Sequence, residues 1–421
     1  MSTHTSTKYL LRGCYVLLMV TVIMMTYIVY NVRLSMTSHF AAGITHVRTG
    51  HENETQHRNG CNTCRNTGAM VRAPNKQAKK KLILFYNPLH WWNDWMEGRT
   101  DSSAVFQNCS VQDCTLTKDV TKLAASDAVF FNMHTLPNVP EKRLGQVWIF
   151  SEFEAPENFA DKDVLNKFMG KINWTFTYRR DSDFHIPHGR FVKRSQVLDD
   201  DFMLQLKSKV RSKVAVGFIS HCGTPSRRME YVEQIKRSGI HVDIYGKCGE
   251  RKCYGKNRHK TSWNITQNHK NKCFSATVPT YKFYLSLENA LCRDYVTEKS
   301  LNLVLRYNIV PVVRDGANRS LYHPPGSTID TKKFRSAVHL GIYLSGLNSN
   351  MAAYQKFFRW RKYFYTEGIL NSWNKGICDL CQRLHNENKY RRIYGDIAAW
   401  YIKPGQQPAC YKPKDLYNKF K

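Results

Sequence analysis

The chain has 421 residues and a formal net charge of +30 at pH 7. This length is enough for two domains of ordinary size. Such a charge suits an anionic partner, and nucleic acid is the first class to consider. The basic residues are scattered, however, and no basic stripe is interleaved with aromatic side chains, so the pattern argues against nucleic acid as the partner.

An apolar run without charged residues extends from Gly13 to Tyr30. It approaches the roughly 20 residues that a helix needs to cross a bilayer, and it exceeds the h-region of about 7–15 residues in a cleaved signal peptide. Lys8 and Arg12 precede it, which slightly favours a cytosolic N-terminus. We therefore expect a cytosolic tail at 1–12, a transmembrane signal-anchor at 13–30 and a lumenal remainder.

Residues 31–80 are polar and show no sustained apolar period, which predicts a weakly ordered lumenal stem. All N-x-S/T sequons lie after the apolar run, so each is topologically available for N-glycosylation. They are at Asn53, Asn108, Asn173, Asn264 and Asn318.

Of the 13 cysteines, Cys14 lies within the apolar run, and the others would meet an oxidising lumen. Two C-x-x-C pairs occur, one at Cys61 and Cys64 and the other at Cys378 and Cys381. A zinc site would have to unite pairs separated by most of the chain, so we expect disulfides of unassigned connectivity.

The globular part begins with a predicted strand at Leu82–Tyr86, followed by strands at Ala128–Met133 and Gln146–Pro156. The last of these ends in two carboxylates, Glu152 and Glu154. These elements place a Rossmann-like domain at 81–205.

The second half begins with a predicted strand near Val214. Apolar residues at Met229, Val232 and Ile235 have helical spacing, and the helix should stop at Gly239 before another strand. We expect a second Rossmann-like domain at 206–380 and a C-terminal segment at 381–421. Strand and helix alternate in both halves, so the predicted fold class is α/β, with the two domains facing a cleft.

The segment from Tyr281 to Val313 reads as strand, polar loop, helix and strand. Its predicted elements are Phe283–Leu287, Thr297–Arg306 and Ile309–Val313. Ligands of such sheets bind beyond the carboxyl ends of the strands, where a polar set collects. That set is Glu288, Asn289, Asp294, Tyr295, Glu298 and Lys299.

Lys299 falls in the first turn of the expected helix, where the helix dipole disfavours a cation. Its position is understandable if an anion such as a diphosphate also docks at that helix end. The remaining positive charge of the chain then belongs to a solvated surface.

The phrases YKFYLSLEN, DYVTEK and VPVV in this segment closely resemble the donor-binding block of the α1,3-fucosyltransferases, glycosyltransferase family 10. One position departs, because the family usually has Phe where Leu287 precedes the Glu-Asn pair. The resemblance extends from about Cys109 to Cys381. It implies the two-domain GT-B architecture, GDP-fucose as donor, a glycan or glycoprotein acceptor and a single-pass type II protein of the Golgi membrane.

The resemblance also identifies a base for transfer to a sugar hydroxyl. The phrase WIFSEFEAPEN is similar to the family's acceptor-side motif, which places the base at Glu154. Glu152 is its rival, because a residue two positions earlier would share the same strand face.

For the leaving diphosphate, ISHCGTPSRRMEYV resembles a family turn and the Arg after it, with His221 in place of Asn. That Arg aligns with Arg228, although sequence alone does not separate it from Arg227. Arg suits a diphosphate because its planar group donates two parallel hydrogen bonds. The donor-binding residues implied by the resemblance are Arg228, Tyr284, Asn289, Tyr295, Glu298 and Lys299, with Glu298 toward sugar hydroxyls or the ribose.

Asp181-Ser182-Asp183 is a D-x-D, the motif that holds a metal and a nucleotide in GT-A transferases. The family has this stretch without using it as a metal site, so we expect a structural role, no metal site and no obligatory cofactor. A divalent cation would at most stimulate. The alternative is a metal-dependent GT-A transferase that uses another nucleotide sugar.

The resemblance predicts an inverting α1,3-fucosyltransferase acting on O3 of N-acetylglucosamine. The acceptor stays open between the N-glycan core and outer-arm LacNAc or LacdiNAc, since acceptor loops vary between relatives. A silent lumenal lectin or scaffold is the remaining alternative, but the chain contains the base and donor cations that such a protein would have lost.

Overall fold

The structure is a computed structural model of the chain, and it divides into two units at Asn75. All the residues it describes belong to the second unit, and none of their helices is both long and apolar enough to cross a membrane. The predicted tail, anchor and nearly all of the stem lie outside the described residues, as do Asn53 and Asn264. The described residues are 79–88, 92–96, 102–136, 138–159, 162–199, 211–252, 272–301 and 307–416.

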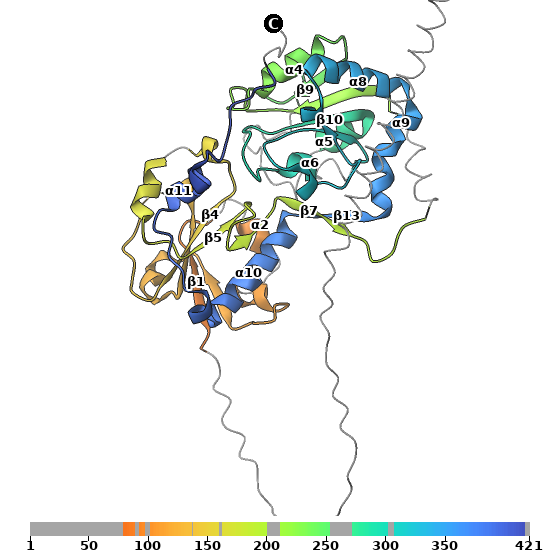
Figure 1. The fold of residues 1–421 in the computed structure, drawn as a ribbon. Coiled ribbons are helices and arrows are strands. Elements are labelled where there is room, and N and C mark those ends of the chain that lie inside the picture. The colour runs from red at the N-terminus through yellow and green to blue at the C-terminus, as the bar shows by residue number, and fades with distance from the viewer. Residues whose placement is uncertain are drawn as a thin grey trace, which may run out of the picture. The chain divides into compact units, whose positions relative to one another are not determined.

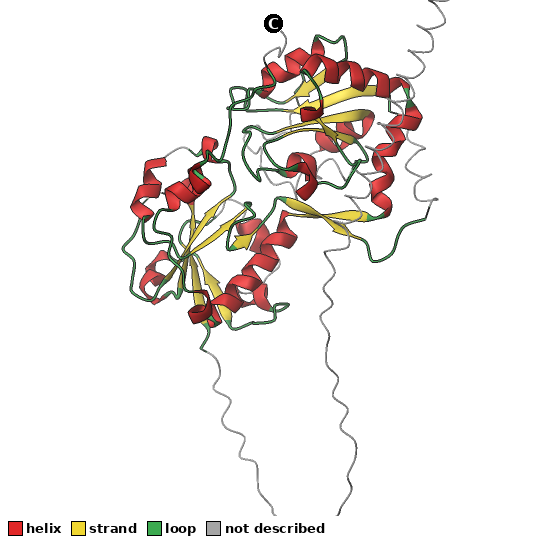
Figure 2. Ribbon diagram, in the orientation of Figure 1, coloured by secondary structure: helices red, strands yellow, loops and turns green. Residues whose placement is uncertain are grey.

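The first sheet has six parallel strands in the order β2-β1-β3-β4-β5-β6 (Figures 1 and 2). Its short connections are mostly 3-10 turns. The strands are β1 (Lys81–Phe85), β2 (Cys114–Thr117), β3 (Ala128–Asn132), β4 (Val147–Glu152), β5 (Trp174–Thr177) and β6 (Phe184–His185). The connecting helices are α2 (Trp92–Met96), η1 (Ser102–Phe106), η2 (Val120–Ala125), η3 (Met133–Thr135), η4 (Pro156–Asn158) and η5 (Lys162–Phe168).

β4 is shorter than the strand expected at Gln146–Pro156. It ends at Glu152, whose own Oε1 accepts hydrogen bonds from the backbone N–H groups of Phe153 (2.9 Å) and Glu154 (2.8 Å). A side chain that binds the next two backbone groups competes with the sheet for them, so the chain leaves the strand at this point. Glu154 therefore does not share a strand face with Glu152.

The second sheet is also fully parallel, in the order β12-β11-β10-β8-β9. The expected α/β class, with one parallel sheet in each half, is thus confirmed. Its strands are β8 (Lys213–Phe218), β9 (Val242–Tyr245), β10 (Tyr281–Leu287), β11 (Val310–Arg314) and β12 (Ile329–Asp330). Its helices are α4 (Arg228–Lys236), α5 (Lys272–Thr277), η7 (Val278–Thr280), α6 (Glu298–Leu301), η8 (Arg319–Leu321), η9 (Thr331–Lys333), α8 (Ala337–Ser349), α9 (Met351–Gln355) and η10 (Lys356–Lys362).

α10 (Ile369–His385) packs on the first sheet, although it follows the second sheet in the chain (Figure 1). Its buried residues Trp373, Ile377, Leu380 and Leu384 recur at helical spacing and join the core around β1 and β3. Gly376 lies on the same side, where a Cβ would meet the Ile186 side chain at 2.3 Å. Only glycine allows so close an approach of this helix.

The packing differs from the predicted division between residues 380 and 381, because that division cuts through α10. After η11 (Glu387–Tyr390), α11 (Ile397–Ile402) and η12 (Pro404–Gln406), Tyr394 and Tyr401 still pack on the first sheet. Leu416 then returns to the core of the second sheet. β7 (Gly189–Lys193), which follows the last strand of the first sheet, forms an antiparallel pair with β13 (Phe364–Gly368), which follows the last strand of the second.

Two disulfides attach α10 to the edge of the first sheet, Cys109–Cys378 and Cys114–Cys381. The second C-x-x-C is therefore a pair of disulfide cysteines, as expected, whereas Cys61 and Cys64 lie outside the described residues. Cys222–Cys248 closes the loop after β8, and Cys292–Cys410 fastens the C-terminal segment to the donor-block loop, the residues between β10 and α6.

Candidate functional site

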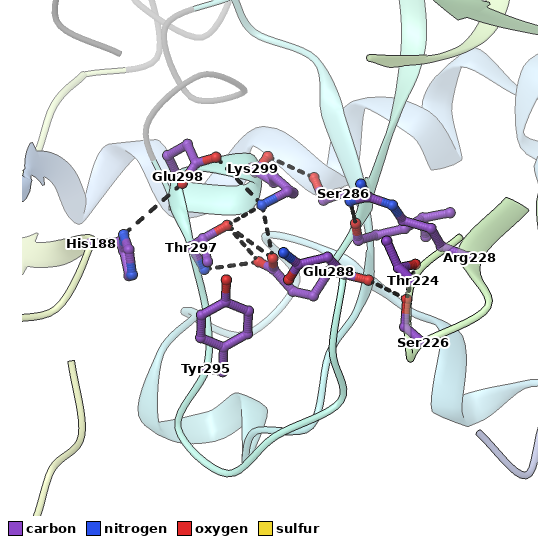
Figure 3. A network of polar contacts seen from close by, with 12 residues as sticks. His188, Thr224, Ser226, Arg228, Ser286, Glu288, Tyr295, Thr297, Glu298 and Lys299 are labelled. Atoms are coloured by element: carbon purple, nitrogen blue, oxygen red, sulfur yellow. Dashed lines mark hydrogen bonds and ion pairs between the residues drawn. The ribbon is translucent and has the colours of Figure 1, made fainter. Parts of the chain in front are cut away.

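A buried charge cluster lies where β10 ends and α6 begins, at the carboxyl edge of the second sheet (Figure 3). The Lys299 Nζ lies 3.0 Å from Glu288 Oε2 and 3.4 Å from Glu298 Oε1, and it donates to Thr297 Oγ1 at 2.8 Å. Glu288 also accepts from the backbone N–H of Thr297 at 2.8 Å. Ser286 Oγ donates to the Lys299 carbonyl at 2.8 Å, which ties α6 to β10.

The three ionisable groups of the cluster shift one another's pKa. Burial raises the pKa of Glu288, and the positive charge of Lys299 partly opposes that rise. Burial also raises the pKa of Glu298, but Lys299 and His188 outweigh it and hold the pKa below the ordinary value. For Lys299, burial lowers the pKa, while Glu288 and Glu298 raise it well above its usual range.

The structure therefore explains the cation of Lys299 at the start of α6 without the bound anion that the sequence suggested. Two carboxylates, Glu288 and Glu298, already balance the cation. A docked anion is not needed to explain a cation at this position. A diphosphate that contacted Lys299 would share it with Glu288.

The structure separates Arg228 from Arg227. Arg228 opens α4, is 4% exposed and donates to the carbonyls of Leu287 and His221, both at 3.1 Å. Burial lowers its pKa, and Glu288 opposes this effect. Arg227 has a left-handed backbone (φ 51°) and pairs outward with Glu230 at 2.7 Å.

Two buried atoms at this edge have no hydrogen-bond partner among the described residues. They are Arg228 Nε and Asn289 Oδ1. Buried polar atoms in native proteins almost always have a partner, so unsatisfied ones require an explanation. A polar ligand at the carboxyl edge of the sheet would supply partners for both.

Glu154 joins the two halves of the structure. Its Oε2 accepts from Tyr295 Oη at 2.9 Å, from Asn158 Nδ2 at 3.3 Å and from Asn289 Nδ2 at 3.5 Å. Its backbone carbonyl accepts from Tyr401 Oη. The predicted base thus lies against two of the predicted donor residues, which come from more than 130 positions later in the chain.

Glu152 occupies a different environment from its rival. It is 2% exposed, and burial raises its pKa to about 8, with the neighbouring Glu154 adding to the rise and the two backbone N–H groups opposing it. His134 Nδ1 lies 3.9 Å from Glu152 Oε1. Glu152 orients the backbone of Glu154 from below the surface, whereas Glu154 is the partly exposed member of the pair.

Tyr284 differs from the other predicted donor residues because its surroundings are aromatic. It lies on β10, is 3% exposed and packs in an aromatic cluster with Phe218 and Phe274. Burial raises its pKa, and the cation of Lys299 partly opposes the rise. Tyr284 therefore supports the wall of the site through packing.

Sequence reasoning missed His188. Its Nε2 lies 3.2 Å from the Phe153 carbonyl, and its Nδ1 lies 4.0 Å from Glu298 Oε2. The ring also makes an edge contact with Tyr295 at 6.2 Å. The polar phrase HIPHG was visible in the sequence, but no spacing linked it to a donor block more than 100 residues later.

The D-x-D motif belongs to the first sheet and is occupied by protein donors. Asp181 Oδ1 accepts from Arg179 Nε at 2.9 Å. Asp183 Oδ2 accepts from the N–H and the hydroxyl of Thr175 and from Tyr394 Oη, at 2.9 to 3.0 Å. Arg392 pairs with Asp183 Oδ1 at 3.2 Å. Both carboxylates thus have partners within the protein, and the absence of a metal from this motif stays a prediction.

The described sequons differ in their surroundings. Asn108 and Asn318 are exposed, whereas the Asn173 amide packs against the chain. Asn173 Oδ1 accepts from the Trp148 N–H at 2.8 Å and from Lys142 at 2.6 Å, and its Nδ2 donates to the Arg392 carbonyl at 3.0 Å.

Comparison with known proteins assigns the family. Residues 78–189 match the family model "Fucosyltransferase, N-terminal", and residues 208–400 match the C-terminal model of "Glycosyltransferase family 10 (fucosyltransferase)". A solved structure titled as an α1,3-fucosyltransferase with GDP covers 77% of this chain and 94% of its own, at 15% identity and a TM-score of 0.44, which is too low to equate residues.

Curated relatives agree with the family models. The chain is 31% identical over 339 residues to glycoprotein 3-α-L-fucosyltransferase A of Drosophila melanogaster, of which it spans 61%. It is 30% identical to α-(1,3)-fucosyltransferase C of the same organism and 29% identical to α-(1,3)-fucosyltransferase 7 of Rattus norvegicus. These matches cover 78% and 81% of the relatives and 77% and 78% of this chain, respectively. The chain therefore belongs to glycosyltransferase family 10, the fucosyltransferases.

Proposed function

We propose that this protein transfers fucose from GDP-fucose to O3 of N-acetylglucosamine in a glycan, with inversion at the anomeric carbon. Family membership and the names of the relatives support the reaction class. The observation that favours it most directly is the contact of Glu154 with Tyr295 and Asn289, because it places a carboxylate of the first half against the donor block of the second.

In the proposed reaction, the acceptor hydroxyl attacks the anomeric carbon of fucose while the bond from that carbon to the diphosphate oxygen breaks. The Glu154 carboxylate takes the proton of the hydroxyl, and GDP leaves with the bonding electrons. One displacement inverts the configuration. Tyr295 and Asn289 donate hydrogen bonds to Glu154 Oε2, which orients the carboxylate toward the donor block.

The leaving diphosphate gains negative charge, and preorganised cations stabilise it best. Arg228 is fixed by two carbonyls and retains an unsatisfied Nε, so it is already oriented for such a contact. Lys299 can contribute when a phosphate oxygen competes with Glu288 and Glu298 for its Nζ. Glu298, beside His188, is available to sugar or ribose hydroxyls.

We propose N-acetylglucosamine as the acceptor sugar, in one of two positions. One candidate is the innermost residue of an N-glycan core, and the other is an outer-arm LacNAc or LacdiNAc unit. The name of one Drosophila relative states that it acts on glycoproteins, which supports a glycoprotein acceptor here. Parallel assays of a core glycopeptide and of free LacNAc decide between them.

We also propose the Golgi lumen as the place of action, with residues 13–30 as a signal-anchor. The disulfides of the described part and the exposed sequons at Asn108 and Asn318 support an oxidising, glycosylating compartment. Protease protection of the globular part in intact microsomes, lost on detergent addition, is the expected result.

A matched pair of variants tests the proposed base. Glu154→Gln should lower turnover by roughly 10²–10⁴ with GDP affinity almost unchanged, because only proton transfer is lost. Glu152→Gln should stay active, since a glutamine oxygen still accepts the N–H groups of Phe153 and Glu154. An active Glu154→Gln variant together with an inactive Glu152→Gln variant would assign the base to Glu152 instead.

A further inference from the structure

A cavity of about 620 Å³ lies between the β6–β7 region, α10 and the segment after η8. Pro187 and the first residue of β7, Gly189, line it, while His188 between them contacts Glu298 and Phe153 in the transfer site. The proposed base and the donor cations are not among the residues that line it. It is therefore a space distinct from the transfer site, and its volume is typical of ligand pockets, about 300–1,000 Å³.

Two lining side chains are almost completely buried and have an atom without a partner among the described residues. His323 is 5% exposed and lacks a partner at Nδ1, and Ser372 is 6% exposed and lacks one at Oγ. The other ring nitrogen of His323 lies 3.1 Å from Ser300 Oγ. Burial, with Arg319 adding to it, lowers the pKa of His323 to about 3, so its ring is neutral.

Both atoms are closed to solvent, and a sugar hydroxyl that reached them from the cavity would recover the free energy that an unsatisfied buried polar atom costs. A neutral imidazole and a hydroxyl can each either donate or accept, which suits the hydroxyls of a sugar. The other walls are aromatic and offer apolar surface to the C–H faces of a sugar ring. They include Phe184, Phe191, Tyr322 and Phe364.

The charges that line the cavity do not cancel. Arg190 is paired with Glu367 at 2.6 Å, and Asp183 is neutralised by Arg392 and Arg383, at 3.2 Å and 3.8 Å. This leaves Arg180 and Lys375, whose side chains form no ion pair within the described part of the chain, against Asp379. Among the residues that line the cavity, the cations are Arg180, Arg190 and Lys375 and the carboxylates are Asp183 and Asp379. This excess of one positive charge favours a ligand with one acidic group.

Two wall residues also hold the donor-block loop. Tyr322 Oη donates to Asp294 Oδ1 at 2.8 Å, next to Tyr295, and His323 contacts Ser300, next to Lys299. A ligand in the cavity would therefore rest against the residues that position the donor block.

We propose that this cavity is a second saccharide subsite, which takes a sugar ring with one acidic group from the same glycan that accepts fucose. The link to the acceptor rests on the proposed function, whereas the saccharide chemistry rests on the cavity alone. The full-length protein, in a detergent without a sugar head group, is titrated with methyl β-glucuronide and methyl β-glucoside by saturation-transfer NMR. The two probes differ only in one carboxylate.

The glucuronide should bind about two- to fivefold more tightly, which is the effect of one partly exposed ion pair. Ser372→Ala should weaken both probes about two- to tenfold, which is the effect of one hydrogen bond, and should leave the stability equal or higher because an unsatisfied hydroxyl is removed. Lys375→Ala, at an exposed position, should abolish only the preference for the glucuronide. Gln382→Ala, exposed on the same helix outside the cavity, should change nothing.

Probe binding that is unchanged in both Ser372→Ala and Lys375→Ala would overturn the subsite, as would no binding of either probe at millimolar concentration. Competition of inorganic sulfate with the glucuronide but not with the glucoside fits the proposal, whereas equal displacement of both would show a simple anion site. Because these measurements require no donor, loss of fucosyl transfer with intact probe binding contradicts the proposed function alone.

Discussion

The Asp183 cluster of the first half and the Lys299 cluster of the second both shield charged side chains from solvent, but they satisfy them differently. In the first, Asp183 is surrounded by hydrogen-bond donors and arginines, and each carboxylate oxygen has a protein partner. In the second, Glu288, Glu298, Lys299 and Arg228 share a smaller set of partners, and Arg228 Nε and the nearby Asn289 Oδ1 have none among the described residues. A charged group whose polar atoms all have protein partners is typical of a structural role. A buried charged group with a polar atom that lacks a partner is typical of a ligand-binding or catalytic site.

Removing the Lys299 cation should have the largest effect of the changes that test this contrast. Lys299→Met should lower turnover by about 10²–10³, the effect of losing one preorganised contact to developing charge. It should also destabilise the fold, since Glu288 stays buried without its cation.

A double variant separates these two effects. Lys299→Met with Glu288→Gln should recover much of the free energy of unfolding, because the most deeply buried carboxylate then carries no charge, while turnover stays low. Glu298 keeps its charge and lies beside His188. Recovery of turnover together with stability would show that Lys299 serves only the fold.

The disulfides on α10 test the stability of the first half. With Cys109–Cys378 intact, removing Cys114–Cys381 opens only a small loop and should cost about 2 kcal/mol of the free energy of unfolding. Removing the remaining bridge opens a loop of 269 residues and should cost about 4–5 kcal/mol more. Denaturant unfolding of paired Cys→Ala variants measures this, and two equal, additive losses would contradict it.

Asp183→Asn is the counterpart of the Lys299 variants in the first half. Losing the charge that faces Arg392 and Arg383 should lower the free energy of unfolding by about 1–3 kcal/mol. The specific activity of the folded protein should not change, and EDTA should not abolish it. Complete, reversible inactivation by EDTA, together with a folded but inactive Asp183→Asn, would favour a GT-A metal site.

The smallest expected effect concerns pH and Glu152. Its pKa is raised to about 8, so the folded protein binds the proton more tightly than the unfolded chain does. Its stabilising contribution is therefore complete below the unfolded-state pKa, about 4.3, and is lost as the pH rises through about 8. Glu152→Gln should remove this decline, and unfolding titrations at pH 5, 7 and 9 measure it. Parallel curves for wild type and variant would show that Glu152 is charged in the folded protein.

Pairs of similar neighbours mark the limit of sequence reasoning. Helical spacing and motif resemblance did not separate Arg228 from Arg227, but a left-handed residue at position 227 turns one side chain outward and the other into the core. Glu152 and Glu154 share a motif, and the early end of β4 gives them separate environments. His188 had no sequence signal, because its partners come from distant segments.

The sequence by itself determined the alternation of strands and helices in both halves, the polar edge after β10 and the family. Apolar periodicity and local motifs depend on residues that are close together in the chain. The tertiary structure decided that α10 completes the core of the first sheet, that Glu154 meets Tyr295 and Asn289, and that Lys299 is balanced by Glu288. Contacts of this kind depend on how distant segments pack, and burial then decides which charges are shared and which stay available.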